Sequence, residues 1–409
     1  MTRPMARTVA RTVLSGGRVF DGTGSAIADA DVVISDGKIV DVGIGLDGDE
    51  QVDISGLTVL PGFIDCHVHV MVSGIDLVRR LQRPFSYQFF QAAANLGATL
   101  DCGITTVRDA GGADLGVQRA VADGLVDGPR MQISISALSQ TGGHGDGWLP
   151  SGMTTFLLTP HPGRPAGLVD GPEEMRKRVR EIIRAGADVI KVHTSGGVLS
   201  PRDNPKHAQF RPDELAALMA EANAAGLPVM AHAQATDGIN NALRAGVRSI
   251  EHGIYLDDEA IDLMLSTGAW LVPTLVAPHA VLNAVASGSQ LPDGVAAKAR
   301  EVIAAHASAF ARAAAAGVKI AMGTDTGVGP HGSNLDELPL MAAGGMTPAQ
   351  VLTATTQSAA ELLRIGDETG TIMPGKRADL VVLDGDPFDL ASLKASIRAV
   401  YVAGRKVRG

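Results

Sequence analysis

Alternating strand and helix patterns in the middle of the chain, flanked by β-rich ends, predict an α/β fold with two domains. Helical stretches such as 213–225 and 257–266 separate eight short apolar runs that have strand character. The expected strands cover 62–69, 104–109, 131–137, 187–193, 227–232, 248–252, 269–275 and 318–325. From His69 to Asp325 the chain runs roughly 250 residues, which is the usual length of eight βα units closed into a barrel. We therefore expect a (β/α)8 TIM-like barrel over residues 62–365.

Both ends of the chain contain strand-like runs that are separated by Gly, Asp and Ser turns. These residues supply the backbone conformations and side-chain hydrogen bonds that hairpin turns need. The runs cover 12–15, 31–34, 38–42, 378–383 and 399–402. We expect residues 1–61 and 366–409 to form one small β-sandwich built from both termini.

Composition favours an enzyme that acts on a small molecule. The 409 residues include 49 glycines, 45% are hydrophobic, and the net charge is −9 without a basic cluster that would suit nucleic acid. Two cysteines, Cys66 and Cys102, are too few for a disulfide framework. No apolar signal segment follows the basic N-terminus, and no run is long enough to span a membrane. We expect a cytoplasmic protein with no nucleic-acid or membrane partner.

A His-x-His pair at the end of an apolar run is the feature around which the chain is organised. In a strand, alternate side chains share a face, so His67 and His69 are expected to point the same way. Four later apolar runs also end in residues that can bind a metal, namely Lys191, His232, His252 and Asp325. The carboxyl ends of barrel strands surround one mouth, where active sites lie, so these side chains are expected to converge.

The longest insertion, roughly 139–171, lies between the third and fourth expected strands and is rich in Gly, Pro and Thr. A loop of this length in a compact domain is usually a lid or a binding loop. It contains His144 and Trp148, which we take as candidates for contact with a substrate.

In order and context, these motifs resemble the amidohydrolase superfamily, and within it the imidazolonepropionase-like and Xaa-Pro or Xaa-Arg dipeptidase-like branch. The resemblance covers nearly the whole chain. It rests on the segments Pro61 to His69, Thr105 to Asp109, Gly142 to Asp146, Lys191, Ser195 to Ser200, His232, Ile250 to Gly253, Gly323 to Asp325, His331 to Asn334, Glu337 and Leu338. It implies homo-oligomers and two divalent metal ions.

The resemblance also implies the ligand set of those metals. His67 and His69 would bind the more buried ion with Asp325, His232 and His252 would bind the other, and Lys191 would bridge the two as a carboxylated lysine. Histidine and carboxylate ligands without cysteine suit an open catalytic site, with zinc as the first expectation. A lysine buried among histidines is costly as a cation, whereas its CO2-derived carbamate is an anion that can join two cations.

The expected chemistry is hydrolysis of a C–N bond. Two metals would lower the pKa of a bridging water to give a hydroxide and would polarise the substrate carbonyl, while Asp325 would carry the proton to the leaving amine. His144 is expected near the substrate carbonyl or carboxylate. His193 shares a face with Lys191 and is either a hydrogen-bond donor behind the ligands or a substrate contact, and His331 is expected at the mouth.

One position at which the chain differs from dipeptidase-like relatives leaves the substrate specificity undetermined. Two residues beyond His232, where dipeptidase-like relatives often have Tyr or His, the chain has Gln234, which neither titrates nor stacks as those rings do. We expect the amide of an N-acyl amino acid or a dipeptide as the substrate. The alternatives are an aryl amide, carbamate, urea or cyclic amide, and, outside enzymes, a barrel without catalysis that serves in assembly.

Overall fold

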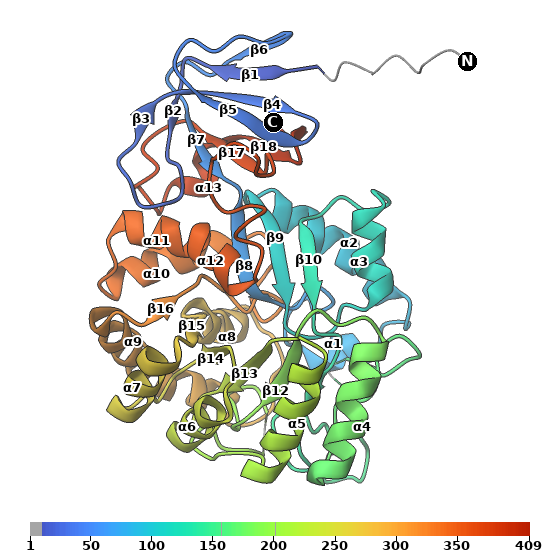
Figure 1. The fold of residues 1–409 in the computed structure, drawn as a ribbon. Helices are drawn as coiled ribbons and strands as arrows, with labels where there is room; N and C mark the ends of the chain where they lie inside the picture. Colours follow the sequence, from blue (N-terminus) through green and yellow to red (C-terminus); the bar gives the residue numbers. More distant parts are fainter. Residues whose placement is uncertain (1–9, 157, 201) are drawn as a thin grey trace. The chain divides into compact units, whose positions relative to one another are not determined.

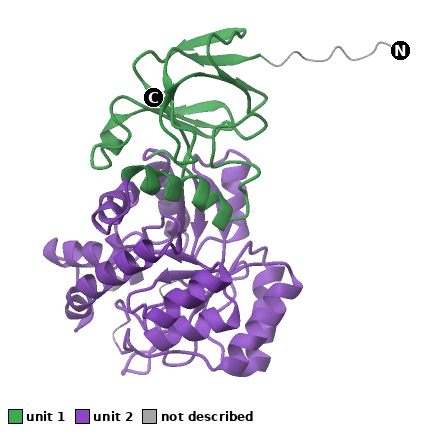
Figure 2. Cartoon of the chain, turned by 60° about the vertical axis from the view of Figure 1, so that its left-hand side comes forward, with its two compact units in different colours: residues 1–64, 103–105, 348–409 green, residues 65–102, 106–347 purple. Residues whose placement is uncertain are grey.

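The computed structural model describes residues 10–409 except 157 and 201. Two compact units make up the chain, coloured separately in Figure 2. One contains residues 1–64, 103–105 and 348–409, and the other contains residues 65–102 and 106–347.

The first unit contains two β-sheets built from both ends of the chain (Figure 1). The four-stranded sheet has the order β5 (Lys38–Gly43), β4 (Asp31–Ser35), β1 (Thr12–Ser15) and β6 (Glu50–Asp53). The six-stranded sheet has the order β19 (Arg405–Arg408), β18 (Ile397–Val402), β17 (Leu380–Leu383), β7 (Thr58–Pro61), β2 (Arg18–Val19) and β3 (Ala28–Asp29). Strands β17 and β7, from opposite ends of the chain, pair antiparallel.

Apolar side chains from both sheets form one core. Leu14 and Val32 of the four-stranded sheet belong to the same buried cluster as Val59, Leu380 and Val382 of the six-stranded sheet. Alternate residues of one strand, such as Leu380 and Val382, therefore face this common core. Three short helices accompany these sheets: α11 (Pro348–Thr355), α12 (Gln357–Leu362) and α13 (Leu393–Ser396).

The strands that supply most of the second unit lie in two further sheets. The three-stranded sheet has the order β10 (Arg130–Ile133), β9 (Ile104–Asp109) and β8 (Phe63–Val68). The six-stranded sheet is parallel throughout, with the order β11 (Ala137–Leu138), β12 (Ile190–His193), β13 (Val229–Ala233), β14 (Ser249–His252), β15 (Trp270–Val272) and β16 (Lys319–Ile320). Each of the eight strand regions expected from the sequence contains a strand, and the expected strand at 131–137 is divided into β10 and β11.

Helices alternate with these strands. They are α1 (Leu77–Leu81), α2 (Tyr87–Leu100), α3 (Leu115–Ala122), α4 (Gly171–Arg184), α5 (Pro212–Ala224), α6 (Thr236–Ala245), α7 (Asp258–Thr267), α8 (Val276–Ala286), α9 (Val295–Ala316) and α10 (Glu337–Ala343), with a 3-10 turn at Asn334–Asp336. None of the described helices combines the length and the apolar character that a membrane crossing requires.

Local sequence explains where these helices begin and end. Asp257 caps α7 by accepting a hydrogen bond from the amide of Ala260 at 2.8 Å, and Gly268 ends the helix in the left-handed conformation. Helix α5 begins with Pro212, and Glu214 reaches back to the amide of Arg211 at 2.7 Å. The two helices expected at 213–225 and 257–266 are thus confirmed.

The chain after β16 returns to β8. The amide of Cys66 donates to the carbonyl of Met322 at 2.9 Å, and the amide of Asp325 donates to the carbonyl of His67 at 2.7 Å. These bonds place Asp325 beside the histidines of β8, although the two segments are about 260 residues apart in the sequence.

Candidate functional site

The two histidines of the His-x-His motif point their ring nitrogens at Asp325. His67 is almost fully buried, and its Nε2 lies 3.5 Å from Oδ1 of Asp325. His69 follows β8 directly, and its Nε2 lies 3.2 Å from the same oxygen. One donor atom from each of the three residues lies within 4.8 Å of the others, which is the spacing of a group that can hold a metal ion. The expected common face of His67 and His69 is present.

The second nitrogen of each histidine is held by a fixed acceptor. His67 donates from Nδ1 to Oε2 of Glu251 at 2.7 Å, and His69 donates from Nδ1 to the carbonyl of Gly111 at 2.8 Å. Such bonds set the tautomer and leave Nε2 with its lone pair directed at the site.

His232 and His252 come from neighbouring strands, β13 and β14, and stand beside this group. Their ring centroids are 4.6 Å apart, and the ring of His252 is 5.1 Å from that of His67. His252 contacts Oγ1 of Thr274 through Nδ1 at 2.7 Å, and His232 contacts the carbonyl of Gly196 through Nε2 at 3.2 Å. Burial holds the pKa of both rings well below the usual range, so they are neutral and retain a lone pair for a cation.

Lys191, from the middle of β12, is the least satisfied of the predicted residues. Only 2% of it is exposed, and Nζ has no hydrogen-bond partner among the described residues. Burial lowers its pKa to about 8, although the charges of Glu251 and Asp325 act in the opposite direction. A buried ammonium without a hydrogen bond is costly, so this position suits a chemically altered lysine.

His144 and His193 extend the histidine cluster. The ring of His144 stacks on that of His232 with centroids 4.3 Å apart, and His193 lies 5.0 Å from His144 and 5.1 Å from His232. His193 and His232 are also direct partners in the pairing of β12 with β13. The long loop therefore brings His144 to the strand ends, as expected from the sequence.

A hydrogen-bond network fixes the orientation of His144. Its Nδ1 lies 2.7 Å from Oγ of Ser200 and 3.3 Å from Oδ2 of Asp203. Lys298 of α9 holds the same segment by donating to the carbonyls of Ser200 at 2.8 Å and Asp203 at 2.6 Å. The network leaves Nε2 of His144 for contact with a ligand.

The other three predicted substrate contacts, Gln234, His331 and Trp148, differ from one another in their burial and contacts. Gln234 is buried, and its Oε1 has no partner within the described residues. His331 donates from Nε2 to the carbonyl of Val72 at 2.9 Å. Trp148 is 47% exposed, and its ring contacts the guanidinium of Arg202 rather than a histidine among the residues described.

Sequence reasoning missed the residues behind the histidines. Glu251 is fully buried, and Arg108 donates to it at 2.9 Å. Burial raises the pKa of Glu251, but the charge of Arg108 and the hydrogen bond from His67 outweigh it and lower the value to about 2. His306 is also buried and donates to the carbonyl of His252 at 2.9 Å.

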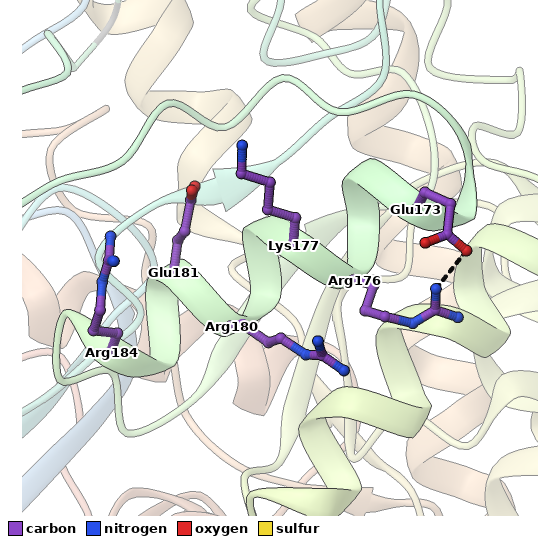
Figure 3. A pocket seen from close by; sticks show the side chains of 6 residues that line it. All are labelled: Glu173, Arg176, Lys177, Arg180, Glu181 and Arg184. Carbon is purple, nitrogen blue, oxygen red and sulfur yellow. Dashed lines mark hydrogen bonds and ion pairs between the residues drawn. The ribbon is translucent and has the colours of Figure 1, made fainter.

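A hollow elsewhere in this unit does not make a site. It measures about 400 Å3 and lies along one face of α4 (Figure 3). Its lining side chains are charged and all come from that helix: Glu173, Arg176, Lys177, Arg180, Glu181 and Arg184. Arg176 pairs with Glu173, and Arg180 pairs with Glu221 of α5 at 2.8 Å, so the surface is a set of solvated ion pairs.

Comparison with known proteins gives consistent matches over most of the chain. The profile described as Amidohydrolase family matches residues 58–407. An ochratoxinase from Aspergillus niger is 35% identical over 92% of this chain and 82% of its own length. The crystal structure of a Xaa-Pro dipeptidase with bound methionine in the active site is 33% identical, with a TM-score of 0.89 over 98% of this chain and 100% of the other. A prolidase complexed with N-methylphosphonate-L-proline is 38% identical, with a TM-score of 0.88 over 97% and 99% of the two chains.

Proposed function

Because this chain belongs to the amidohydrolase family and is a hydrolase that acts on C–N bonds, we propose that it cleaves the amide of an N-acyl amino acid or a dipeptide with the help of two divalent metal ions. The family implies a TIM-like barrel with a small second domain, and we assign residues 62–365 to the barrel and 1–61 with 366–409 to the sandwich. The observation that carries the proposal is the convergence of four histidine rings and the Asp325 carboxylate, which come from separate strand ends.

The described side chains fit such a metal centre. His67, His69 and Asp325 would hold one ion, and His232 with His252 would hold the other. Lys191 would join the two as a carbamate. This modification would explain why its buried Nζ has no hydrogen-bond partner among the described residues. When bound, zinc or a similar ion polarises a carbonyl and makes water a stronger acid. The noncatalytic alternative has no support from the site, because all six positions carry residues able to bind.

Residues of the chain itself would then transfer the proton and orient the substrate. Asp325 accepts the proton of the attacking water and delivers it to the leaving nitrogen as the C–O bond forms and the C–N bond breaks. His144, fixed by Ser200 and Asp203, would contact the substrate near its carbonyl or carboxylate through Nε2. His193 and Gln234 would orient the substrate, because each has a buried atom that finds no hydrogen-bond partner among the described residues.

The substrate class rests on chemistry and on the relatives. The Xaa-Pro dipeptidase binds methionine in its active site, and the prolidase binds a proline derivative, so both accommodate an amino acid. An aryl amide is the second candidate, and the half-exposed Trp148 in the long loop favours it. Carbamates, ureas and cyclic amides would require the same bond chemistry.

A hydrolysis screen tests this proposal. Purified protein supplied with zinc, manganese or cobalt is assayed on N-acetyl amino acids, dipeptides, anilides and carbamates, with amine release as the readout. We expect release from at least one N-acyl amino acid or dipeptide, with Asp325→Asn as the inactive control. Turnover of anilides or carbamates alone would replace the substrate class by the second candidate.

A further inference from the structure

A second cavity in this unit, which we call the arginine cavity, measures about 330 Å3. Its walls come from the segment after β8, from α1, from the start of α2, from the long loop and from the end of α8. The lining side chains include Arg79, Arg80, Arg83, Phe85, Tyr87 and Phe156. The predicted metal ligands are not among its lining residues.

The lining of the arginine cavity is positively charged. It includes three arginines but a single acidic residue, Asp76. The carboxylate of Asp76 is already engaged, because it caps α1 by accepting a hydrogen bond from the amide of Arg79 at 2.9 Å. Arg83 lies over the ring of Tyr87, 4.6 Å from its centroid. The three guanidinium groups of the lining therefore outnumber its one carboxylate.

Arg80 has a guanidinium group whose hydrogen-bonding capacity is not fully used. Its Nε and Nη1 atoms are buried, and neither finds a hydrogen-bond acceptor among the described residues. Burial also lowers the pKa of Arg80, with a smaller opposing effect from the charge of Asp76. A guanidinium withdrawn from water without an acceptor is unfavourable, and a carboxylate is the group whose geometry matches it best.

Part of the remaining wall is apolar. Phe85 and Phe156 expose 50% and 42% of their surfaces, and Met71 and Ile75 also line the space. Such a surface stabilises a hydrocarbon or aromatic group, which inorganic phosphate or sulfate lacks.

We propose that the arginine cavity binds a small organic acid, with the carboxylate on Arg80 and an apolar group against Phe85, Tyr87 and Phe156. Met71 and Ser73 line the cavity only a few residues beyond His69, so the acid can be the carboxylate end of the substrate or a separate effector. The first source rests on the proposed function, whereas the binding site itself does not.

Calorimetric binding of 3-phenylpropanoate to the full-length, metal-loaded protein tests the site, with 3-phenylpropanamide as the uncharged probe. We expect the acid to bind and the amide to bind at least about tenfold more weakly, since a charge-assisted hydrogen bond is lost. Arg80→Met should weaken binding of the acid by at least about tenfold, and Arg80→Lys by less. Arg119→Met, which changes an exposed arginine of α3 outside the cavity, should bind as the wild type does.

Equal affinity of the wild type and Arg80→Met for the acid, at unchanged melting temperature, would overturn the proposal and place the carboxylate elsewhere, the metal centre included. Inhibition kinetics on the best substrate identify the source of the acid. Competitive inhibition assigns the cavity to the substrate, and an effect that persists at saturating substrate assigns it to an effector. If no amide is hydrolysed, the proposed function fails while the calorimetry still decides whether the cavity binds acids.

Discussion

At the scale of single residues, a hydrogen bond to Nδ1 determines which nitrogen can face a metal in three of the four predicted ligand histidines, whereas His232 contacts the carbonyl of Gly196 through Nε2. Glu251 holds Nδ1 of His67, Gly111 holds Nδ1 of His69, and Thr274 holds Nδ1 of His252. Each of these bonds leaves Nε2 for the site. A partner behind a ligand histidine is as much part of a metal centre as the ligand itself, so Glu251 belongs to the proposed site.

Asp325 is expected to be essential for turnover. Asp325→Asn keeps the size of the side chain and one oxygen but cannot accept a proton at neutral pH. We expect kcat to fall by roughly 10²- to 10⁴-fold, the range typical of a lost general acid–base group, with folding retained. Steady-state kinetics and circular dichroism measure the two effects. Near-wild-type turnover would leave Asp325 as a ligand only and would direct the search for the proton carrier to His144.

Glu337 is expected to make stability depend on pH. It is fully buried against the start of α8, accepting from the amides of Leu275 at 2.8 Å and Val276 at 2.7 Å, and burial raises its pKa to about 8. Between pH 4.5 and 8 the unfolded chain releases this proton more readily than the folded chain does. Rising pH therefore favours unfolding, by on the order of 5 kcal/mol over the interval.

Glu337→Gln should remove this part of the pH dependence, and urea unfolding from pH 5 to pH 9 measures it. Asp262→Asn, an exposed change on α7, is the matched control and should leave the slope unaltered. A slope in Glu337→Gln as steep as that of the wild type would mean that Glu337 ionises alike in both states.

The sequence predicts the ligand histidines better than it predicts the residues that hydrogen-bond to them. Strand periodicity places His67 and His69 on one face, and their ring centroids are indeed 5.5 Å apart. The same periodicity would put Glu251 and His252 on opposite faces, yet both approach His67. His252 has a φ of 71°, which breaks the alternation at the end of β14 and which a one-dimensional pattern cannot show.

At the scale of secondary-structure elements, the residues of the candidate site lie both at the ends of strands and in the segments that follow them. Asp325, like His252, has a positive φ, at 59°. Non-glycine residues adopt this conformation rarely, and such residues are concentrated at functional sites. Strands β12, β13 and β14 lie side by side in one parallel sheet, and this order brings Lys191, His232 and His252 together (Figure 1).

Helix α9 is expected to control His144 through Lys298. Lys298→Met removes the donor to the carbonyls of Ser200 and Asp203, so the segment that holds His144 should loosen. We expect kcat/KM to fall about tenfold with metal content unchanged. Lys177→Met, which changes an exposed lysine of α4, is the control and should have no effect.

A double variant distinguishes this role from a general loss of stability. If Lys298 acts through His144, then Lys298→Met should add little to the defect of His144→Ala. Fully additive defects in kcat/KM would contradict the coupling and leave Lys298 as a stabilising contact only.

At the scale of the whole molecule, the order of elements could be predicted because each expected strand is a separate apolar run bounded by turn residues. The runs at 12–15 and 38–42 correspond to β1 and β5, and 378–383 contains β17. The division of the expected strand 131–137 into β10 and β11 was not predicted, because the break includes Ile135 with a φ of 66°, which a sequence pattern does not show. Long-range partners such as Arg108 and Glu251 depend on which strands become neighbours, and this follows from the tertiary fold rather than from local pattern.

The metal content of purified wild type and Lys191→Ala tests the central claim most directly. Elemental mass spectrometry, combined with activity before and after chelation, should give close to two divalent ions per chain in the wild type and loss of activity on their removal. Lys191→Ala should lose metal as well as activity, since the bridging carbamate is gone. Acetate or propionate should restore part of the rate in Lys191→Ala but not in Lys191→Arg, whose cationic side chain fills the space. Full activity in rigorously metal-free wild type would contradict the account.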